Sequence, residues 1–240
     1  MTRLLIDGDI LLYQVTSAVE EPIHWGNDWW SLTADAKLAK EMVAQEVDDL
    51  KQTLDANAVT ITLSDPENNW RHSVLDSYKA NRRGKRKPVI YVPIREWLGE
   101  VYETVSFKTL EADDVMGILI DDDSIIVSDD KDMQTIPGRV YRPCTGQLRK
   151  ITKMEADRQH LLQTLTGDAT DGYSGCPRVG PVTAEKILEE GTWDEVVGAY
   201  EKAGFGEEFA LAQARVARIL RFGEWNPMTE EVKLWQPDAP

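Results

Sequence analysis

Short aliphatic runs alternate with longer stretches of helical periodicity along the first half of the chain. The runs RLLID, VTITLSD and SIIVSDDKD each lead directly into aspartate, at Asp7, Asp65, Asp130 and Asp132. Continuous aliphatic runs of this length are typical of strands buried on both faces of a parallel sheet. Between the runs, residues 35–54 and 111–120 carry apolar side chains at helical spacing. The alternation predicts an α/β fold.

The pattern changes after Asp132. Turn-forming Pro-Gly and Thr-Gly pairs bracket residues 139–151, where we expect a β-hairpin. The T-x-x-E spacing of Thr152 and Glu155 is a capping box, and it predicts a helix that reaches about Leu165. A further amphipathic helix is expected to start at Gly191-Thr192, and residues 207–221 are read as another. The second half is therefore expected to be mainly helical.

The charge of the chain is unevenly distributed. The 240 residues have a net charge of −15, which argues against a general polyanion binder because long-range repulsion would slow its approach to nucleic acid. Basic residues are nevertheless gathered in two stretches without acids, residues 77–95 and 139–153. The alternative interpretation is that these stretches form solvent-exposed surface without a binding role. Cys144 and Cys176 lack metal-type spacing, and no segment reaches the ~20 apolar residues of a spanning helix, so we expect a soluble, intracellular protein.

Carboxylates are the candidate chemistry. In an open parallel sheet, ligands bind beyond the carboxyl ends of the strands, so acids at these ends should meet in one pocket. The candidates are Asp7, Asp65, Glu111, Asp113, Asp114, Asp130, Asp132, Asp168 and Asp171. Any one of them is more simply a turn former or helix cap, but together they would repel one another unless cations neutralised them.

An all-oxygen ligand set suits Mg²⁺ or Mn²⁺, and the three histidines of the chain show no pattern of zinc ligands. Two such ions roughly 4 Å apart can hydrolyse a phosphodiester without a protein nucleophile. Consistently, the sequence contains no G-x-S-x-G elbow, Walker A loop or dinucleotide fingerprint.

Five motifs, in this order, carry a family resemblance. They are WRH at residues 70–72, YKANR at 78–82, EADDV at 111–115, SDDKD at 128–132, and TGDATD at 166–171 followed by GCPRVGPVTA at 175–184. Together they resemble the 5′ nucleases, a family that includes flap endonucleases, the 5′-to-3′ exonuclease domain of bacterial DNA polymerase I and stand-alone phage 5′-to-3′ exonucleases. The short length is most similar to the phage enzymes.

The resemblance implies a fold and an activity. The fold would be a PIN-like, mostly parallel sheet flanked by helices in residues 1–164, with a helical arch at about 77–95. Residues 165–240 would form a helix-hairpin-helix (H3TH) DNA-binding lobe and tail. The activity would be that of a 5′-to-3′ exonuclease or structure-specific 5′ flap endonuclease that uses two Mg²⁺ or Mn²⁺ ions. If the gene is phage-encoded, the enzyme would work in the cytoplasm of a bacterial host.

The resemblance also assigns roles to residues. The candidate carboxylates would be metal ligands, with Asp114 the weakest match, and Lys79 and Arg82 would act on the scissile phosphate. The residues implied in DNA binding are Arg71, Tyr78, Arg83, Lys85, Arg86, Lys87, Gly175, Arg178, Gly180 and Thr183. The turn at residues 175–180 would contact duplex phosphates and hold K⁺.

The sequence departs from the family pattern at three positions of this region. Gly172 stands where asparagine is usual, Arg178 where glycine is usual and Val182 where lysine is usual. Arg178 would replace the missing lysine as a phosphate contact. The departures leave open whether the turn keeps the family's geometry and its K⁺ site.

Two other functions compete with the 5′ nuclease. A PIN-type ribonuclease would share the acidic crevice, but such chains are usually shorter and lack the hairpin motif. A non-catalytic DNA-binding homologue would keep the fold without the chemistry, and the intact acids argue against it. The sequence leaves open the preference among blunt duplex, nick, flap and RNA/DNA hybrid, the contacts with replication proteins and the oligomeric state.

Overall fold

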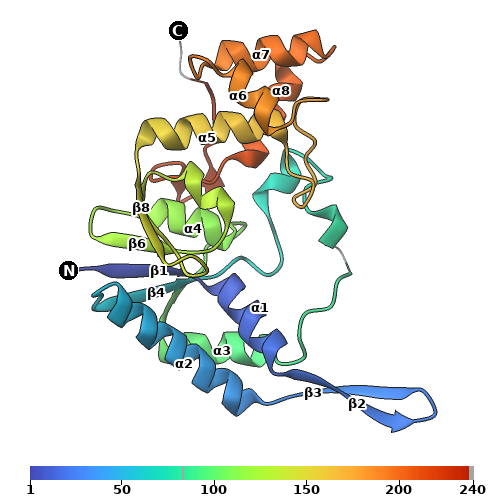
Figure 1. Cartoon of the computed structure of the whole chain (residues 1–240), viewed down its shortest axis with the longest axis vertical. Coiled ribbons are helices and arrows are strands. Elements are labelled where there is room, and N and C mark those ends of the chain that lie inside the picture. Colours follow the sequence, from blue (N-terminus) through green and yellow to red (C-terminus); the bar gives the residue numbers. More distant parts are fainter. Residues whose placement is uncertain (83, 238–240) are drawn as a thin grey trace.

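A computed structural model describes residues 1–82 and 84–237 of the chain. Its centre is a six-stranded sheet in the order β5-β4-β1-β6-β7-β8 (Figure 1). The strands are β1 (Arg3–Asp7), β4 (Ala58–Thr62), β5 (Glu103–Val105), β6 (Ser124–Val127), β7 (Gly138–Arg142) and β8 (Gln147–Ile151). The first five in this order pair in parallel, and β8 runs antiparallel to β7. The predicted mostly parallel α/β sheet is confirmed.

The three predicted aspartate-linked strands are the central neighbours β4, β1 and β6. Their side chains are buried on both faces of the sheet. On β1, Leu4 packs into one hydrophobic cluster and Leu5 into another, and both are fully buried. This two-sided burial explains why the strands read as unbroken aliphatic runs.

Helices cover both faces of the sheet. On the face of Leu4 lie α1 (Gly8–Ala18), α2 (Ala36–Thr53) and α3 (Tyr91–Val101), and on the face of Leu5 lie α4 (Ala112–Leu119) and α5 (Lys153–Thr166). The capping box of Thr152 and Glu155 begins α5 as expected. In the part of the chain that the structure describes, no helix combines the length and apolar character needed to cross a bilayer.

The second half of α5 belongs to a helical lobe. It packs with α6 (Pro181–Ile187), α7 (Trp193–Lys202) and α8 (Glu207–Ala217) around Leu165 and Tyr200. The predicted helices are present, although α8 ends at Ala217 rather than at residue 221. The chain then returns to the sheet, where β9 (Trp225–Asn226) and β10 (Glu231–Val232) pair and Trp225 stacks on Phe107 with ring centroids 4.2 Å apart. The lobe boundary at residue 165 remains a prediction.

Of the helical arch predicted at about residues 77–95, only residues 91–95 are α-helical, as the start of α3 (Tyr91–Val101), and the prediction is wrong for the described part of residues 77–90. Between residues 77 and 90 the structure describes only one short 3₁₀ turn, η2 (Ala80–Arg82), and the α-helix begins at Tyr91. Gly84 and Pro88 disfavour a helix here, and so does the like-charge pair Arg82 and Arg86, which would lie four positions apart on one helix face. We call residues 77–90 the arch segment.

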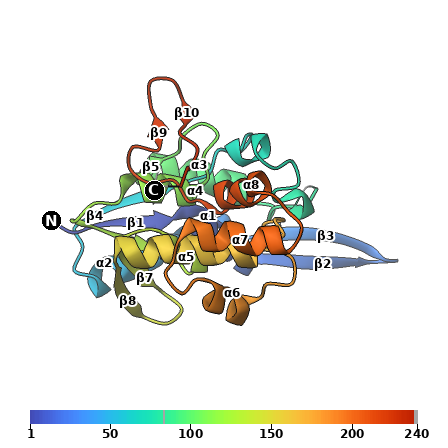
Figure 2. The ribbon, with the colours of Figure 1, turned by 90° about the horizontal axis from the view of Figure 1, so that it is seen from above.

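One element was not expected from the sequence. Strands β2 (Glu20–Gly26) and β3 (Trp29–Ala34) form an antiparallel hairpin that projects from the body of the molecule (Figures 1 and 2). Its turn residues Asn27 and Asp28 have φ angles of 50° and 59°. Asparagine and aspartate tolerate this left-handed conformation, which a two-residue hairpin turn of type I′ requires.

Candidate active site

The acids at the ends of β1 and β6 are held by local backbone geometry. Asp7 is the last residue of β1 and caps α1, where its Oδ1 accepts a hydrogen bond from Ile10 N at 3.0 Å. Its Oδ2 accepts one from Ser128 Oγ, also at 3.0 Å. Asp130 caps the 3₁₀ helix η3 (Lys131–Thr135) and accepts from Asp132 N at 2.8 Å. The capping role expected of single aspartates is therefore real, and the same caps bring the acids to one edge of the sheet.

Asp7, Asp113 and Asp130 repel one another at this edge. Burial, together with the charges of Asp9 and Asp130, raises the pKa of Asp7 to about 7. Burial and the charges of Asp7 and Asp130 also raise the pKa of Asp113 well above its ordinary value. A neighbouring cation would relieve both effects.

A second set of acids adjoins the first. Burial and the charge of Asp130 raise the pKa of Asp132 to about 7. Asp168 pairs with Lys131 at 2.6 Å, and this ion pair with the Thr170 N–H outweighs burial and lowers the pKa of Asp168. Asp171 pairs with Arg82 at 2.7 Å, yet burial keeps its pKa raised.

Glu111 connects these acids to the arch segment. The Lys79 ammonium contacts the Glu111 carboxylate and lies 3.7 Å from Asp171. The Tyr78 hydroxyl donates to Glu111 at 2.8 Å and to Asp171 at 3.2 Å. Although burial on its own raises the pKa of Glu111, Lys79 and Arg71 hold it at about 2. The predicted catalytic pair, Lys79 and Arg82, therefore lies beside the acids.

Gly172 allows the backbone that carries Asp168 and Asp171 to lie close to the arch segment. The turn at residues 168–173 packs directly on the arch segment, where Lys79 N donates to Asp171 O at 2.7 Å. Gly172 has a φ of +78°, and a Cβ there would lie 2.7 Å from Ser77 O. Asparagine, usual in the family at this position, would not fit this backbone approach, so the departure at Gly172 is explained.

Replacing Gly172 tests that contact. We expect Gly172→Ala to lose about 2 kcal/mol or more of stability and to lower turnover about a hundredfold, because the turn and Lys79 must move apart. Thermal melts and cleavage rates measure the two effects. Gly198→Ala is the matched control, since a Cβ there meets nothing within 4 Å on helix α7 and should slightly stabilise the protein. Equal behaviour of the two variants would contradict the packing argument.

Asp114 is turned into the protein rather than toward the acids. It is fully buried, and its two oxygens accept hydrogen bonds from five donors. These donors are Arg71 Nη1 and Nη2, Trp70 Nε1, Glu111 N and Leu220 N. The contacts join α4, the 3₁₀ helix η1 (Trp70–Ser73) and the C-terminal segment. Both oxygens of Asp114 are thus used by protein donors, and Asp114 has a structural role instead of the predicted role as a metal ligand.

Two predicted DNA contacts are wrong for a related reason. Arg71 and Tyr78 are each only 2% exposed, so neither can reach a ligand at the surface. Arg71 also donates to the carbonyl oxygens of Val216 and Arg218, at 3.0 and 2.6 Å. Both side chains instead hold Glu111 in place from inside the protein.

Asp65 lies apart from the coupled acids. Its oxygens accept hydrogen bonds from Glu67 N at 2.9 Å and Thr109 N at 2.7 Å. These backbone bonds outweigh burial and lower its pKa, with Arg95 adding to the effect. A metal-binding role for Asp65 stays a prediction, and in the structure it acts as a turn former.

Three residues that hold the acids were not predicted. Lys131 pairs with Asp168, Gln163 Nε2 donates to Asp132, and Ser128 donates to Asp7. Lys131 and Ser128 lie inside the SDDKD motif, which could have drawn attention to them. Gln163 comes from the interior of α5 and carries no such signal.

The basic residues of the arch segment lie at the surface. Lys85, Arg86 and Lys87 are exposed, and Arg83 lies outside the described residues. Arg86 is paired with Glu20 of the β2–β3 hairpin through contacts of 2.5 and 2.8 Å. The Lys87 ammonium lies 4.3 Å from the centre of the Tyr91 ring. Their role as phosphate contacts stays a prediction.

The turn before α6 keeps a regular geometry despite its unusual residue. Val179 N donates to Cys176 O at 3.1 Å, and Arg178 takes the left-handed conformation with a φ of 65°. Glycine is usual in the family because it adopts this conformation without strain. Arg178, Gly180 and Thr183 are exposed. Gly175 is buried and its N–H donates to Gln213 at 3.0 Å, so the prediction that Gly175 contacts DNA is wrong.

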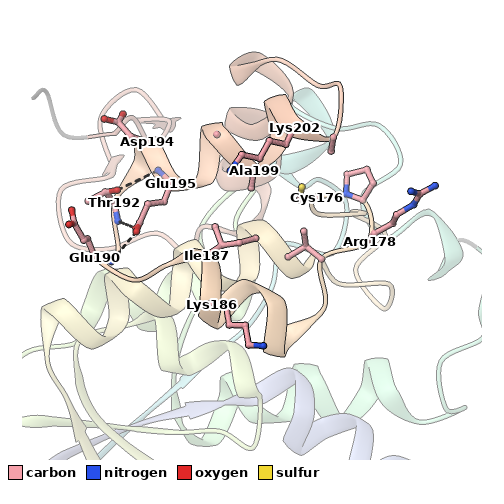
Figure 3. A pocket seen from close by; sticks show the side chains of 14 residues that line it. Cys176, Arg178, Lys186, Ile187, Glu190, Thr192, Asp194, Glu195, Ala199 and Lys202 are labelled. Carbon is pink, nitrogen blue, oxygen red and sulfur yellow. Dashed lines mark hydrogen bonds between the residues drawn. The ribbon is translucent and has the colours of Figure 1, made fainter.

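A cavity of about 1070 Å³ opens between this turn, α6 and α7 (Figure 3). Cys176, Ile187 and Ala199 line it, and Arg178 extends outward from the turn. The α7 end of the cavity is fixed by a capping box in which Thr192 and Glu195 bond each other's backbone. The exposed turn therefore lies across the cavity from α7, whose N-terminus is fixed by this capping box.

The donor set of the acidic edge fits hard divalent cations. Its candidate ligands are carboxylates, and burial together with their mutual repulsion raises the pKa values of Asp7, Asp113 and Asp132. Among residues 1–82 and 84–237, no three His, Cys, Asp or Glu side chains enclose a common point closely enough to hold a metal ion as they lie. Part of the negative charge of the acids is neutralised by ion pairs with Lys79, Arg82 and Lys131.

Comparisons with known proteins agree with this geometry. The sequence model of a family described as the 5′-3′ exonuclease, N-terminal resolvase-like domain matches residues 2–163. The exodeoxyribonuclease of Enterobacteria phage T3 is 32% identical, with 98% of this chain and 92% of that protein covered. The exonuclease of Escherichia phage T7 is also 32% identical, with 98% and 93% covered.

The fold also resembles a solved nuclease. A flap endonuclease of bacteriophage T5, solved as a pseudo-enzyme-product complex with DNA and metal ions, superimposes with a TM-score of 0.68. The two chains are 15% identical, and the match covers 90% of this chain and 89% of the other. At this identity the likeness concerns the fold.

Proposed function

The chain belongs to the 5′-3′ exonuclease family, and from that membership we propose that it hydrolyses phosphodiester bonds at 5′ ends of DNA. It would act as a metal-dependent 5′-3′ exonuclease and structure-specific flap endonuclease. One observation carries this proposal: the coupled acids at the carboxyl ends of the central strands lie beside Lys79 and Arg82. The comparison with two full-length phage relatives supports the same reaction class.

The acids would hold two divalent cations, Mg²⁺ or Mn²⁺. Asp7, Asp113 and Asp130 form one side of the set, and Asp132, Asp168 and Asp171 form the other. The bound ions would activate the attacking water and stabilise the departing oxygen. The raised pKa values of Asp7 and Asp132 support this assignment, since crowded carboxylates are those that a cation stabilises most.

Lys79 and Arg82 would bind the scissile phosphate. Burial alone lowers the pKa of the Lys79 ammonium, but Glu111 and Asp171 outweigh it and keep the group protonated. A fixed ammonium in a partly buried site stabilises the charge that develops on a phosphate during hydrolysis. To do so, Lys79 and Arg82 would exchange their carboxylate partners for phosphate oxygens, while Arg71 and Tyr78 keep Glu111 in position.

Duplex DNA would bind to the turn before α6. Arg178, Gly180 and Thr183 are exposed there, and Lys85 and Lys87 add positive charge on the arch segment. A K⁺ ion at the turn is part of the proposal, and replacing K⁺ by a large organic cation at constant ionic strength tests it. RNA in RNA/DNA hybrids and contacts with replication proteins extend the substrate proposal, and the reaction would take place in the cytoplasm of a bacterial host.

A panel of 5′-labelled substrates tests the function. It includes a blunt duplex, a nick, a flap, an RNA/DNA hybrid and single-stranded RNA, each incubated with Mg²⁺ and with EDTA. We expect products that form from 5′ ends of DNA with Mg²⁺ and none with EDTA. Cleavage confined to single-stranded RNA would favour the ribonuclease alternative, and DNA binding without any cleavage would favour the non-catalytic one.

Arg178 gives a prediction about duplex binding. We expect Arg178→Ala to weaken duplex affinity severalfold and to reduce the salt slope by about one, because one phosphate contact is lost. Short single-stranded 5′ ends should be cleaved normally. Arg178→Gly is the matched control, because it removes the same charge and relieves the left-handed strain, so it should lose the same affinity and gain about 1 kcal/mol of stability over Arg178→Ala. An unchanged salt slope in both variants would contradict the contact.

A further inference from the structure

The β2–β3 hairpin carries aromatic side chains on a face that the rest of the chain leaves open. Its register pairs Glu20 with Ala34, Pro22 with Leu32 and His24 with Trp30, so the side chains of these pairs lie on one face. The rings of His24 and Trp30 stack with centroids 4.3 Å apart. Trp30 is 61% exposed and Leu32 is 40% exposed. We call Pro22, His24, Trp30 and Leu32 the hairpin stacking face.

The other tryptophans of the hairpin belong to the opposite face. Trp25 Nε1 donates to Ser31 Oγ at 2.8 Å, and alternation along β3 puts Trp29 on the side of Ser31. Trp29 is 74% exposed. Trp29 and Trp30 therefore lie on opposite faces of the same strand, so replacing each in turn compares the two faces.

The base of the hairpin is joined to the arch segment and to helix α1. At the base of the hairpin, Glu20 binds Arg86 of the arch segment and accepts from Val89 N at 2.7 Å. Tyr13 lies on α1 and is 55% exposed. Helix α1 begins next to Asp7 and ends at the base of the hairpin (Figure 1). Helix α1 thus connects the acidic edge to the hairpin base, with Tyr13 exposed along it and Arg86 beside Glu20.

The charges differ between the hairpin and the arch segment beside its base. Residues 20–34 contain no lysine or arginine and three acids, Glu20, Glu21 and Asp28. Asp28 at the turn would therefore repel phosphates from the hairpin tip, whereas Lys85 and Lys87 would attract them near the base, where Arg86 neutralises Glu20. Nucleobases carry no charge and stack on exposed rings with little regard to sequence. A stiff duplex keeps its bases covered, so only a single strand could present bases to the hairpin.

We propose that the hairpin stacking face binds the bases of the single-stranded 5′ tail that extends beyond the acidic edge. The proposal rests on the proposed 5′ nuclease function, because that function supplies a 5′ tail at Asp7. Tyr13 and the arch segment would guide the strand to the hairpin, where His24 and Trp30 stack with its bases. The tail would then be held outside the catalytic edge while the duplex is held by the lobe.

The test compares Trp30→Ala with Trp29→Ala. Each removes one exposed tryptophan from the same strand, but only Trp30 belongs to the stacking face. Affinity is measured in Ca²⁺ for a duplex with a 5′ tail of ~12 nucleotides, within the range that single-strand surfaces cover, and for the same duplex without the tail. We expect Trp30→Ala to reduce the tailed-to-blunt affinity ratio about tenfold and Trp29→Ala to leave it within twofold.

Three outcomes would overturn the proposal. The ratio could be unchanged in Trp30→Ala, or it could fall equally in both variants. Alternatively, sedimentation of the protein without DNA could show dimers that Trp30→Ala abolishes, which would assign the face to a second copy of the chain. Because binding in Ca²⁺ does not require hydrolysis, a wild-type protein that binds the tail but cleaves nothing would refute the proposed function and leave the stacking face supported.

Discussion

Asp132→Asn is expected to abolish hydrolysis and to stabilise the metal-free protein. Turnover should fall about a thousandfold or more, because a site that loses one carboxylate loses several kcal/mol of transition-state stabilisation through its cations. DNA affinity in Ca²⁺ or without metal should be unchanged or higher, since one charge that repels the phosphate is gone. The amide retains an oxygen that can accept from Gln163, so the local packing is preserved.

The stability effect has a defined pH window. The pKa of Asp132 is about 7 in the folded protein and about 4 in the unfolded chain, so the folded state holds the proton more tightly. As the pH rises from 4 to 7, ionisation of Asp132 therefore lowers the stability of the wild-type protein. Asp132→Asn has no ionisable group at this position and does not lose that stability. In EDTA, its stability relative to the wild type should grow across this window to about 1 kcal/mol or more at pH 8. Below pH 4 the two proteins should be equally stable.

Asp129→Asn is the control for this prediction. Asp129 belongs to the same motif, but its carboxylate accepts a hydrogen bond from Cys144 N at 2.9 Å and does not join the coupled acids. Its replacement should leave cleavage within a fewfold of wild type. If Asp132→Asn cleaved DNA normally and gained no stability over the wild type in EDTA at pH 8, Asp132 would be a structural residue and not a metal ligand.

Lys79→Ala is expected to reduce turnover about a hundredfold to a thousandfold while duplex affinity stays within severalfold. The ammonium lies between Glu111 and Asp171, where it would meet the reacting phosphate and not the flanking duplex. Single-turnover rates and affinities in Ca²⁺ separate the two effects. Lys87→Ala, an exposed basic residue over the Tyr91 ring, should show the reverse, with weaker binding and nearly normal turnover.

A structural explanation of the Lys79 effect can be separated from a catalytic one. Removing Lys79 leaves Glu111 with Arg71 and Tyr78 as partners, so some stability should be lost as well. Lys79→Arg keeps the charge and should recover part of the turnover. Equal losses of affinity and turnover in Lys79→Ala would make Lys79 a general phosphate contact.

Features set by local sequence were predictable. The aliphatic runs that end in aspartate became the three central strands, and the two-sided burial of Leu4 and Leu5 explains why the signal was strong. The capping box at Thr152 was equally reliable, because both of its hydrogen bonds join residues three positions apart. The motif order was enough to name the family.

Features set by distant contacts were not predictable. Asp114 shares a motif with Glu111 and Asp113, but it faces inward because Arg71 and Leu220 N bind it from 43 and 106 residues away. The sequence likewise predicts a DNA contact for Arg71, because it shows the charge of Arg71 but not the buried partners that bind it. The turn signal at Asn27-Asp28 was readable, but tryptophans on both faces hid the alternation that marks a strand.

Counting bound cations tests the central claim most directly. Mn²⁺ titrated into the metal-free protein and followed by calorimetry should show about two ions bound per chain, as a two-metal site requires. The same titration should show at least one ion lost or much weakened in Asp132→Asn and no change in Asp129→Asn. Saturable binding that is identical in all three proteins, or no binding at all, would contradict the assignment of the acidic edge as the catalytic centre.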